Sequence, residues 1–268
     1  MMEWLWKRWN RKQKRYRLSA AGRCDIGKVR SNNEDNLYFG GRILPQEHQR
    51  TEQSLKETVW TVPQAVYGVF DGMGGEENGE VASFLAAQAL KQACMEQKFS
   101  GTALLEHVVQ EMNAQVAAEA DKVHGRVGTT SVMLVFQEDQ LICGNVGDSR
   151  AYRLRNDVLS QLSTDHNDAE FLRRQGVTHR RPRLTQYIGL NPQEVRICPS
   201  WFRDNVAAGD KYLLCSDGLT DMLSDDEIGA LLQESGTPEE SVELLVHEAM
   251  KQGGCDNTTV IVVTVQEE

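Results

Sequence analysis

Long apolar runs are missing from this chain of 268 residues: no stretch approaches the roughly 20 apolar residues that a membrane-spanning helix needs. The N-terminus is basic, but no apolar segment follows it, so we expect no secretory signal. The six cysteines are scattered, mostly inside apolar runs, and none forms a C-x-x-C pair. This usage is typical of reduced thiols, and we expect a cytoplasmic protein.

Nucleotide-binding and zinc-binding motifs are also missing. No G-x-x-x-x-G-K-[ST] sequence occurs, and Glu77 stands where a G-x-G-x-x-G motif beginning at Gly72 would need its third glycine. The six histidines include no i, i+4 pair, so zinc has no obvious site. The net charge of −10 disfavours nucleic-acid binding, because phosphate contacts need a basic surface.

The charge is unevenly distributed along the chain. Residues 1–17 contain seven Lys or Arg and one acidic residue, which leaves −16 on the remainder. Three tryptophans are interleaved with these cations: Trp4, Trp6 and Trp9. Two interpretations stay open, a peripheral anchor on an anionic membrane surface or a partner, and a solvated arm. We expect residues 1–17 to be a tail and residues 18–268 to be one domain.

Hydrophobic patterns predict an α+β fold. Strands are expected near 18–26, 35–39, 59–70, 129–136, 139–146, 149–155, 195–201, 211–216 and 257–265. Helical periodicity runs through 81–85 and 105–116, and capping boxes at Ser224/Glu227 and Thr237/Glu240 begin two later helices. The polar stretch 40–58 is expected to be a long loop. Because strands and helices do not alternate, we expect packed sheets flanked by helices.

Acidic residues recur at the ends of apolar runs. Asp71 and Asp217 follow such runs, Asp256 precedes one, and the pair Glu34-Asp35 precedes a short strand. A single Asp-Gly is more often a turn than a ligand, but four acidic sites of this kind favour a shared function. Carboxylate oxygens bind hard divalent cations, and two such cations can activate water for phosphoryl displacement. Arg30 supplies a planar fork suited to a phosphate.

A second chemistry is compatible with part of this region. Cys24 and Arg30 have the C-x5-R spacing of cysteine-dependent phosphatases, in which a thiolate attacks phosphorus and the arginine binds phosphate oxygens. The intervening loop has only one glycine and places Asp25 beside the anion. This hypothesis also leaves Asp71, Asp217 and Asp256 unexplained.

Eight segments together resemble the metal-dependent PPM-type (type 2C) Ser/Thr protein phosphatases in their bacterial single-domain form. They are RSNNEDN (30–36), VFDGMGG (69–75), GTTSVMLVF (128–136), GNVGDSRAYRLR (144–155), LSTDH (162–166), LTQYIG (184–189), GDKYLLCSDGLTDML (209–223) and GGCDNTTVIVV (253–263). The resemblance covers about 18–265. It implies a central β-sandwich with helices on both outer faces, and two Mn²⁺ or Mg²⁺ ions at one end.

The resemblance also implies roles for individual residues. Asp71 would bridge both metals, Gly72 would offer its carbonyl to the second, and Asp217 and Asp256 would bind the first. Glu34 would hold the second metal, directly or through water. Asp35 would orient metal-bound water and Arg30 would bind the phosphate. Metal-activated hydroxide would then attack phosphoserine or phosphothreonine directly. A non-catalytic phosphoprotein-binding module of the same fold is the alternative.

Three departures from the family pattern matter. Met73 stands where eukaryotic members carry a histidine proposed as the leaving-group acid, so water or another group must donate that proton. Residues 124–127 lack the aspartate that binds a third metal, and Asp121 lies too far back, so we expect two ions. The segment 167–183 is short and basic, a solvated face or a binding site for acidic or phosphorylated substrates. We expect Asp148 to stabilise a turn beneath the site.

The resemblance also implies partners: phosphorylated proteins as substrates and a cognate bacterial Ser/Thr kinase in signalling. We expect a monomer.

Overall fold

Two antiparallel sheets pack face to face in the computed structural model, which describes residues 15–73, 78–123, 127–177 and 180–267. The first sheet has the order β10 (Val158–Gln161), β9 (Arg150–Arg155), β12 (Lys211–Cys215), β13 (Thr258–Glu267), β1 (Tyr16–Asp25) and β4 (Leu55–Trp60). The second has the order β11 (Ser200–Asn205), β8 (Gln140–Val146), β7 (Ser131–Gln137), β5 (Ala65–Met73), β2 (Asp35–Phe39) and β3 (Arg42–Ile43), with β6 (Gly128–Thr129) paired to β5.

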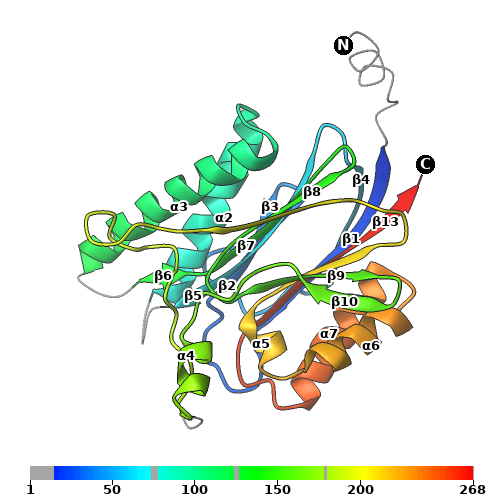
Figure 1. Ribbon diagram of the computed structural model, residues 1–268. Helices are drawn as coiled ribbons and strands as arrows, with labels where there is room; N and C mark the ends of the chain where they lie inside the picture. The colour runs from blue at the N-terminus through cyan, green and yellow to red at the C-terminus, as the bar shows by residue number, and fades with distance from the viewer. Residues whose placement is uncertain (1–14, 74–77, 124–126, 178–179, 268) are drawn as a thin grey trace.

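Helices cover both outer faces of the sandwich (Figure 1). The second sheet is covered by α2 (Gly79–Glu96) and α3 (Gly101–Val123). The first is covered by α6 (Asp225–Glu234) and α7 (Pro238–Lys251), and the short α5 (Asp217–Thr220) follows β12. A further short helix, α4 (Ala169–Arg174), projects away from the sheets. The expected sandwich with helices on both faces is therefore confirmed.

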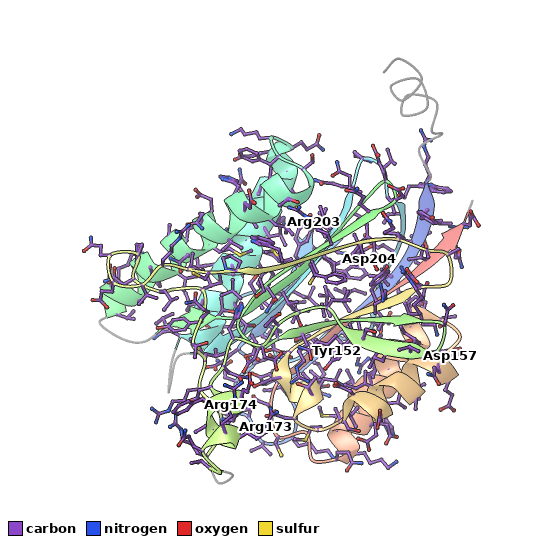
Figure 2. All side chains as sticks on the ribbon, viewed as in Figure 1. Tyr152, Asp157, Arg173, Arg174, Arg203 and Asp204 are labelled. Carbon is purple, nitrogen blue, oxygen red and sulfur yellow. The ribbon has the colours of Figure 1, made fainter. Side chains whose placement is uncertain are left out.

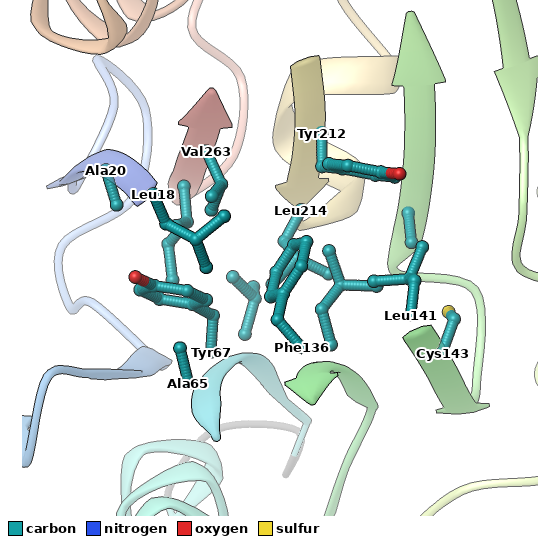
Figure 3. Close-up of a cluster of buried hydrophobic side chains, with 14 of the residues drawn as sticks. Leu18, Ala20, Ala65, Tyr67, Phe136, Leu141, Cys143, Tyr212, Leu214 and Val263 are labelled. Atoms are coloured by element: carbon teal, nitrogen blue, oxygen red, sulfur yellow. The ribbon is translucent and has the colours of Figure 1, made fainter. Parts of the chain in front are cut away.

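Strands buried on both sides explain the continuous apolar runs. Along β13, Ile261 and Val263 face the space between the sheets, whereas Val260 and Val262 face α7. The inter-sheet core contains large aromatic rings; Tyr67 is among the side chains drawn in Figure 3. This rigid double layer is the scaffold from which the loops at its ends project.

Both capping boxes form as the sequence predicts. The Ser224 hydroxyl accepts from the Glu227 backbone N–H, and the Thr237 hydroxyl accepts from that of Glu240, with each glutamate returning to its cap. These caps fix where α6 and α7 begin.

The stretch expected to be a loop, 40–58, is only partly one. It contains β3 and the first part of β4, an edge strand whose residues alternate between partly buried and exposed. The segment expected at 195–201 forms a strand later, at 200–205. β1 begins at Tyr16, which is buried, two residues before the expected domain start. Within the described residues, no helix is long and apolar enough to cross a membrane.

Candidate metal centre and phosphate site

Several strand ends meet at one end of the sandwich. β1, β5 and β12 finish there, and β2 and β13 begin there, because an antiparallel pair places the end of one strand beside the start of the next. Asp25 lies opposite Thr258, and Asp35 lies opposite Asp71. Acidic residues from separate segments of the chain are thereby gathered at one edge.

A pocket of about 680 Å³ opens at this edge. Its wall holds five carboxylates and three arginines: Glu34, Asp71, Asp148, Asp217, Asp256, Arg30, Arg181 and Arg183. Gly72 and Met73 also line it. Six of the seven site residues predicted from the sequence therefore share one wall, and Asp35 is the exception.

Backbone hydrogen bonds hold the end of β5 in place. The Thr130 N–H donates to the Asp71 carbonyl over 2.8 Å, and the Thr130 hydroxyl accepts from the Asp71 N–H over 3.1 Å. The Gly72 N–H donates to the Glu34 carbonyl over 3.0 Å. A Cβ on Gly72 would stand only 2.1 Å from the Gly79 carbonyl oxygen, so no larger residue fits there.

The loop that carries Arg30 is tied to the start of β13 by one amide. The Asn257 side-chain NH₂ donates to the carbonyls of Ile26 and Asn32, over 2.9 and 3.0 Å. Its oxygen accepts from the Glu34 N–H over 2.8 Å. Asn257 is almost fully buried, so these three bonds position the loop relative to the acidic residues.

Two arginines pair with the acidic wall. Arg30 donates to Asp256 over 2.6 Å. Arg181 donates to Asp217 over 2.8 Å and to Asp221 over 3.0 Å. Arg30 is therefore held at the pocket with its guanidinium next to the carboxylates. A phosphate attracted by cations bound to these carboxylates would lie within reach of it.

The acidic wall is electrostatically crowded. Burial raises the pKa of Asp71 well above its usual range, and the charges of Asp217 and Asp35 raise it further. Burial raises the pKa of Asp217 to about 6, and the neighbouring Asp148 and Asp221 add to this rise. Carboxylates this close repel one another in their ionised form, so bound cations would stabilise the ionised wall.

The donor set fits hard divalent cations. The wall offers oxygen ligands, and carboxylates outnumber arginines five to three. As the side chains stand in the described parts of the chain, no three carboxylate, thiol or imidazole groups converge on one ligand point. Asp256 and Asp217 are instead turned to Arg30 and Arg181, whose guanidinium groups a cation would have to replace.

Asp35 lies beneath the pocket wall, not on it. It is 1% exposed, and one of its oxygens accepts from the Ser216 hydroxyl over 2.7 Å. Its other oxygen is buried without a hydrogen-bond partner. Burial raises the pKa of Asp35 to about 7. The charges of Asp217 and Asp256 also raise the pKa of Asp35, so this buried carboxylate adds to the crowding of the acidic wall.

The cysteine-dependent alternative fails on the position of Cys24. This thiol is fully buried in the inter-sheet core and does not line the pocket. Burial raises the pKa of Cys24 to about 12, whereas a nucleophilic cysteine needs a lowered pKa. Its sulfur accepts from Asn33 and Thr259, and Arg30 points instead to Asp256.

Comparisons with known proteins agree with this geometry. The family model "Protein phosphatase 2C" matches residues 41–171. The serine/threonine phosphatase stp of Listeria innocua is 32% identical over 258 residues, which cover 92% of this chain and 95% of that protein. The chain belongs to the protein phosphatase 2C family.

The phosphatase PstP extends the match, both as a sequence and as a solved structure. The serine/threonine protein phosphatase PstP of Mycobacterium tuberculosis is 34% identical over 260 residues, or 92% of this chain and 45% of that protein. A crystal structure of the PstP catalytic domain in complex with two manganese ions superposes with a TM-score of 0.76 at 32% identity. It covers 94% of this chain and 100% of that one.

Departures from the family pattern can be placed in the structure. Met73 lines the pocket, where its thioether has no proton to donate. Asp121 lies outside that pocket and lines a neighbouring cavity, and the expectation for 124–126 falls outside the described residues. Asp148 is in the pocket wall, accepting from Asn167 over 3.3 Å, so our expectation that it lies beneath the site is wrong.

The basic segment 167–183 divides into paired and pocket-facing arginines. Arg174 pairs with Glu170 within α4, and Arg180 pairs with Asp168. Figure 2 shows the neighbouring Arg173 and Arg174 on α4. Arg181 and Arg183 line the pocket instead, so the segment is part solvated face and part pocket wall.

Sequence reasoning did not single out several residues of the site. Asn257 and Ser216 stand beside predicted acids, but nothing in their spacing indicates which backbone groups they meet. Thr130 lies in a segment predicted only as a strand, and it lines the pocket. The charge of Arg181 was noted, but its contact with Asp217 spans 36 residues and depends on the fold.

Proposed function

We propose that this protein is a metal-dependent Ser/Thr protein phosphatase, which hydrolyses phosphoserine and phosphothreonine in proteins with two Mn²⁺ or Mg²⁺ ions. One observation carries the proposal: five carboxylates brought together from distant segments share a pocket with Arg30 in a phosphatase 2C fold. The manganese ions in the PstP structure support the choice of metal. When bound, the two ions lower the pKa of a coordinated water and neutralise charge on the phosphoryl oxygens.

The residues of the wall take the following roles in this proposal. With two ions bound, Asp71 would be a ligand of both, Asp217 and Asp256 would hold the first, and Glu34 and the Gly72 carbonyl would hold the second. The position of Asp71 at the centre of the crowded carboxylates supports its bridging role. Thr130 and Asn257 hold these ligands at fixed separations through the backbone.

Arg30 binds and orients the phosphate. Its guanidinium donates a hydrogen bond to Asp256, which is a metal ligand in this proposal. Arg30 therefore lies next to the proposed metal site. Asp35 lies below the wall, where its carboxylate adds negative charge near the metal ligands. In this proposal its Oδ1, which has no hydrogen-bond partner, orients water. Because Met73 carries no proton, the serine or threonine oxygen takes its proton from water in the open pocket.

The wider assignment is also a proposal. The catalytic domain extends from Tyr16, where β1 begins, to residue 268, so the tail expected over residues 1–17 is shortened to the basic residues before β1, which contact a membrane surface or a partner in this proposal. We propose a cytoplasmic monomer that opposes a Ser/Thr kinase in bacterial signalling and binds no nucleic acid. Support comes from the acidic body and from relatives named as Ser/Thr phosphatases. Co-sedimentation with anionic vesicles, with and without residues 1–15, tests the tail and leaves β1 intact; equal binding would exclude the anchor.

Hydrolysis of an aryl phosphate and of a phosphothreonine peptide tests the central proposal. Activity should require added Mn²⁺ or Mg²⁺, disappear in EDTA and return when the metal is restored. Iodoacetamide should not reach Cys24, because this thiol is buried, so alkylation should not remove activity through Cys24. Activity that survives EDTA would refute the proposal.

The alternative is a phosphoprotein-binding module without catalysis. Calorimetric titration with Mn²⁺ separates the two, since a catalytic centre must bind the ions. No Mn²⁺ binding in this titration would favour the binding module.

A further inference from the structure

A second cavity adjoins the metal pocket and shares one wall with it. This cavity has a volume of about 340 Å³ and lies between the end of α3 and the segment 187–195. Tyr187 lines both the cavity and the metal pocket. A substrate whose phosphate enters the pocket would therefore have neighbouring residues within reach of the cavity.

The dividing ring is held in a fixed place. A Cβ on Gly128 would stand 2.6 Å from the Tyr187 ring and 2.8 Å from the Met73 methyl, so the ring packs on bare backbone. The next residue, Ile188, exchanges two backbone hydrogen bonds with Thr129, over 3.0 and 2.8 Å. The wall between pocket and cavity is thus built on the same strand end as the site.

The segment beyond the ring is fastened to α3. The Asn113 side chain accepts from the Gly189 N–H over 2.9 Å and donates to the Leu190 carbonyl over 2.9 Å. Asn113 is buried, so both bonds are shielded from water. A cavity with two anchored walls is preorganised, which lowers the entropic cost of binding a chain segment.

The chemistry of the cavity selects a cation with an apolar stem. Apolar groups of Val127 and Pro192 line it, and among the described residues of its lining the charged ones are two acids, Asp121 and Glu194. Both acids are exposed, and neither forms an ion pair with another of the described residues. Lysine and arginine side chains match this pattern, because their alkyl stems bury against apolar surface while the charge stays at the rim.

We propose that this cavity is a substrate subsite that binds a lysine or arginine near the phosphorylated residue. The inference rests on the proposed phosphatase function and adds a substrate class to it. In an extended peptide, whose residues advance about 3.3 Å each, the basic residue would lie close in sequence to the phosphoresidue, on the other side of the Tyr187 ring. The arginines of the metal pocket bind the phosphate, and the acids of the cavity bind the flanking cation.

Phosphopeptide kinetics with the Mn²⁺-loaded full chain test the subsite. In a host peptide of small residues, lysine or glutamate is placed in turn at each position on both sides of phosphothreonine. Lysine at one of the near positions should lower KM relative to glutamate, with little change in kcat. No preference for lysine at any position would overturn the proposal.

Variants that remove the charges of the cavity test whether its acids cause the preference for lysine. Asp121→Asn with Glu194→Gln should reduce the lysine preference roughly 3- to 10-fold, as expected for losing two exposed ion pairs. The matched control, Glu111→Lys, changes an exposed acid of α3 that lines none of the described cavities, and should leave the preference intact. An unchanged preference in the double variant would overturn the assignment.

Failure of the subsite and failure of the phosphatase function give different results. Aryl phosphate lacks flanking residues, so its hydrolysis reports on the metal site alone and should be equal in wild type and the double variant. If aryl phosphate is not hydrolysed, fluorescence anisotropy with the same lysine and glutamate phosphopeptides still measures the preference. Equal affinity for the two peptides would then refute the subsite.

Discussion

Replacing Asn257 with alanine should both destabilise the protein and weaken its hold on phosphate. The amide makes three hydrogen bonds that join the start of β13 to the loop carrying Arg30. Alanine removes all three and leaves one N–H and two carbonyl groups without their partners. The perturbation therefore acts on the scaffold of the site and changes no charged residue in it.

The magnitude follows from the number of bonds and their burial. A net hydrogen bond contributes about 0.5–1.5 kcal/mol, and a backbone group left unsatisfied in the interior costs about 1–3 kcal/mol. Because Asn257 also lines the open pocket, water can reach some of these groups, so we expect a loss of about 2–4 kcal/mol. For a domain of this size that corresponds to a fall of roughly 5–15 °C in Tm.

Urea unfolding monitored by circular dichroism measures the loss in the free energy of unfolding. Kinetics with aryl phosphate measure the effect on phosphate binding by Arg30. KM should rise more than kcat falls, because the phosphate-binding loop loses its tether. Asn257→Asp keeps the acceptor for the Glu34 N–H but loses both donors, so it should also be destabilised. A loss below about 0.5 kcal/mol in the alanine variant would refute the reasoning.

Asn36 provides a matched control. It is buried, and its amide also makes three bonds, to the backbone of Leu37 and Leu44, but it lies outside the pocket wall. Asn36→Ala should lose comparable stability while its folded fraction retains the wild-type KM. A similar rise in KM in both variants would mean that general destabilisation, not loop position, accounts for the effect.

Four further predictions concern the site. Asp71→Asn should abolish turnover while circular dichroism shows an intact fold, and residual activity above about 1% of wild type would contradict the bridging role. Arg30→Ala should lower kcat/KM for aryl phosphate roughly 10- to 150-fold, the equivalent of about 1.5–3 kcal/mol, and Arg30→Lys should restore little because it lacks the fork. Cys24→Ala should keep full kcat in Mn²⁺, whereas its inactivity as a folded protein would revive the thiol mechanism. In EDTA, the free energy of unfolding measured with urea should fall as pH rises from about 4 to 7. The reason is that the folded pKa values of Asp217, about 6, and Asp35, about 7, lie above the unfolded value of about 3.9. A free energy of unfolding that rises over this window, or one whose pH dependence is unchanged in Asp217→Asn, would contradict this.

The sequence was sufficient for the strands that are buried on both faces. β5, β7 and β13 are continuous apolar runs, and their residues contact helices on one side and the opposite sheet on the other. β4 was hidden because an edge strand with one solvated face carries polar residues such as Lys56 and Glu57, which also occur in loops. α4 was missed because six residues are too few to show helical periodicity.

The acids of the site could be predicted, but their partners could not. Asp71, Asp217 and Asp256 repeat a local pattern, an acid at the end of an apolar run, which is visible in one dimension. Asn257 and Arg181 act through contacts with residues far away in the chain, and no local pattern specifies these contacts. The burial of Asp35 also depends on strand register, which local sequence does not reveal.

The pairing of β1 with β13 has a consequence for how the protein can be attached to something else. Tyr16 lies opposite Glu267 at one end of this pair, and Asp25 lies opposite Thr258 at the other, beside the pocket. The start of β1 and the end of β13 therefore lie side by side at the same end of the sandwich, as Figure 1 shows. The ten residues of β1 span about 30 Å at roughly 3.3 Å per residue. A surface or fusion partner held against Tyr16 or Glu267 would sit behind the molecule, with the pocket facing outward and open to approaching substrates.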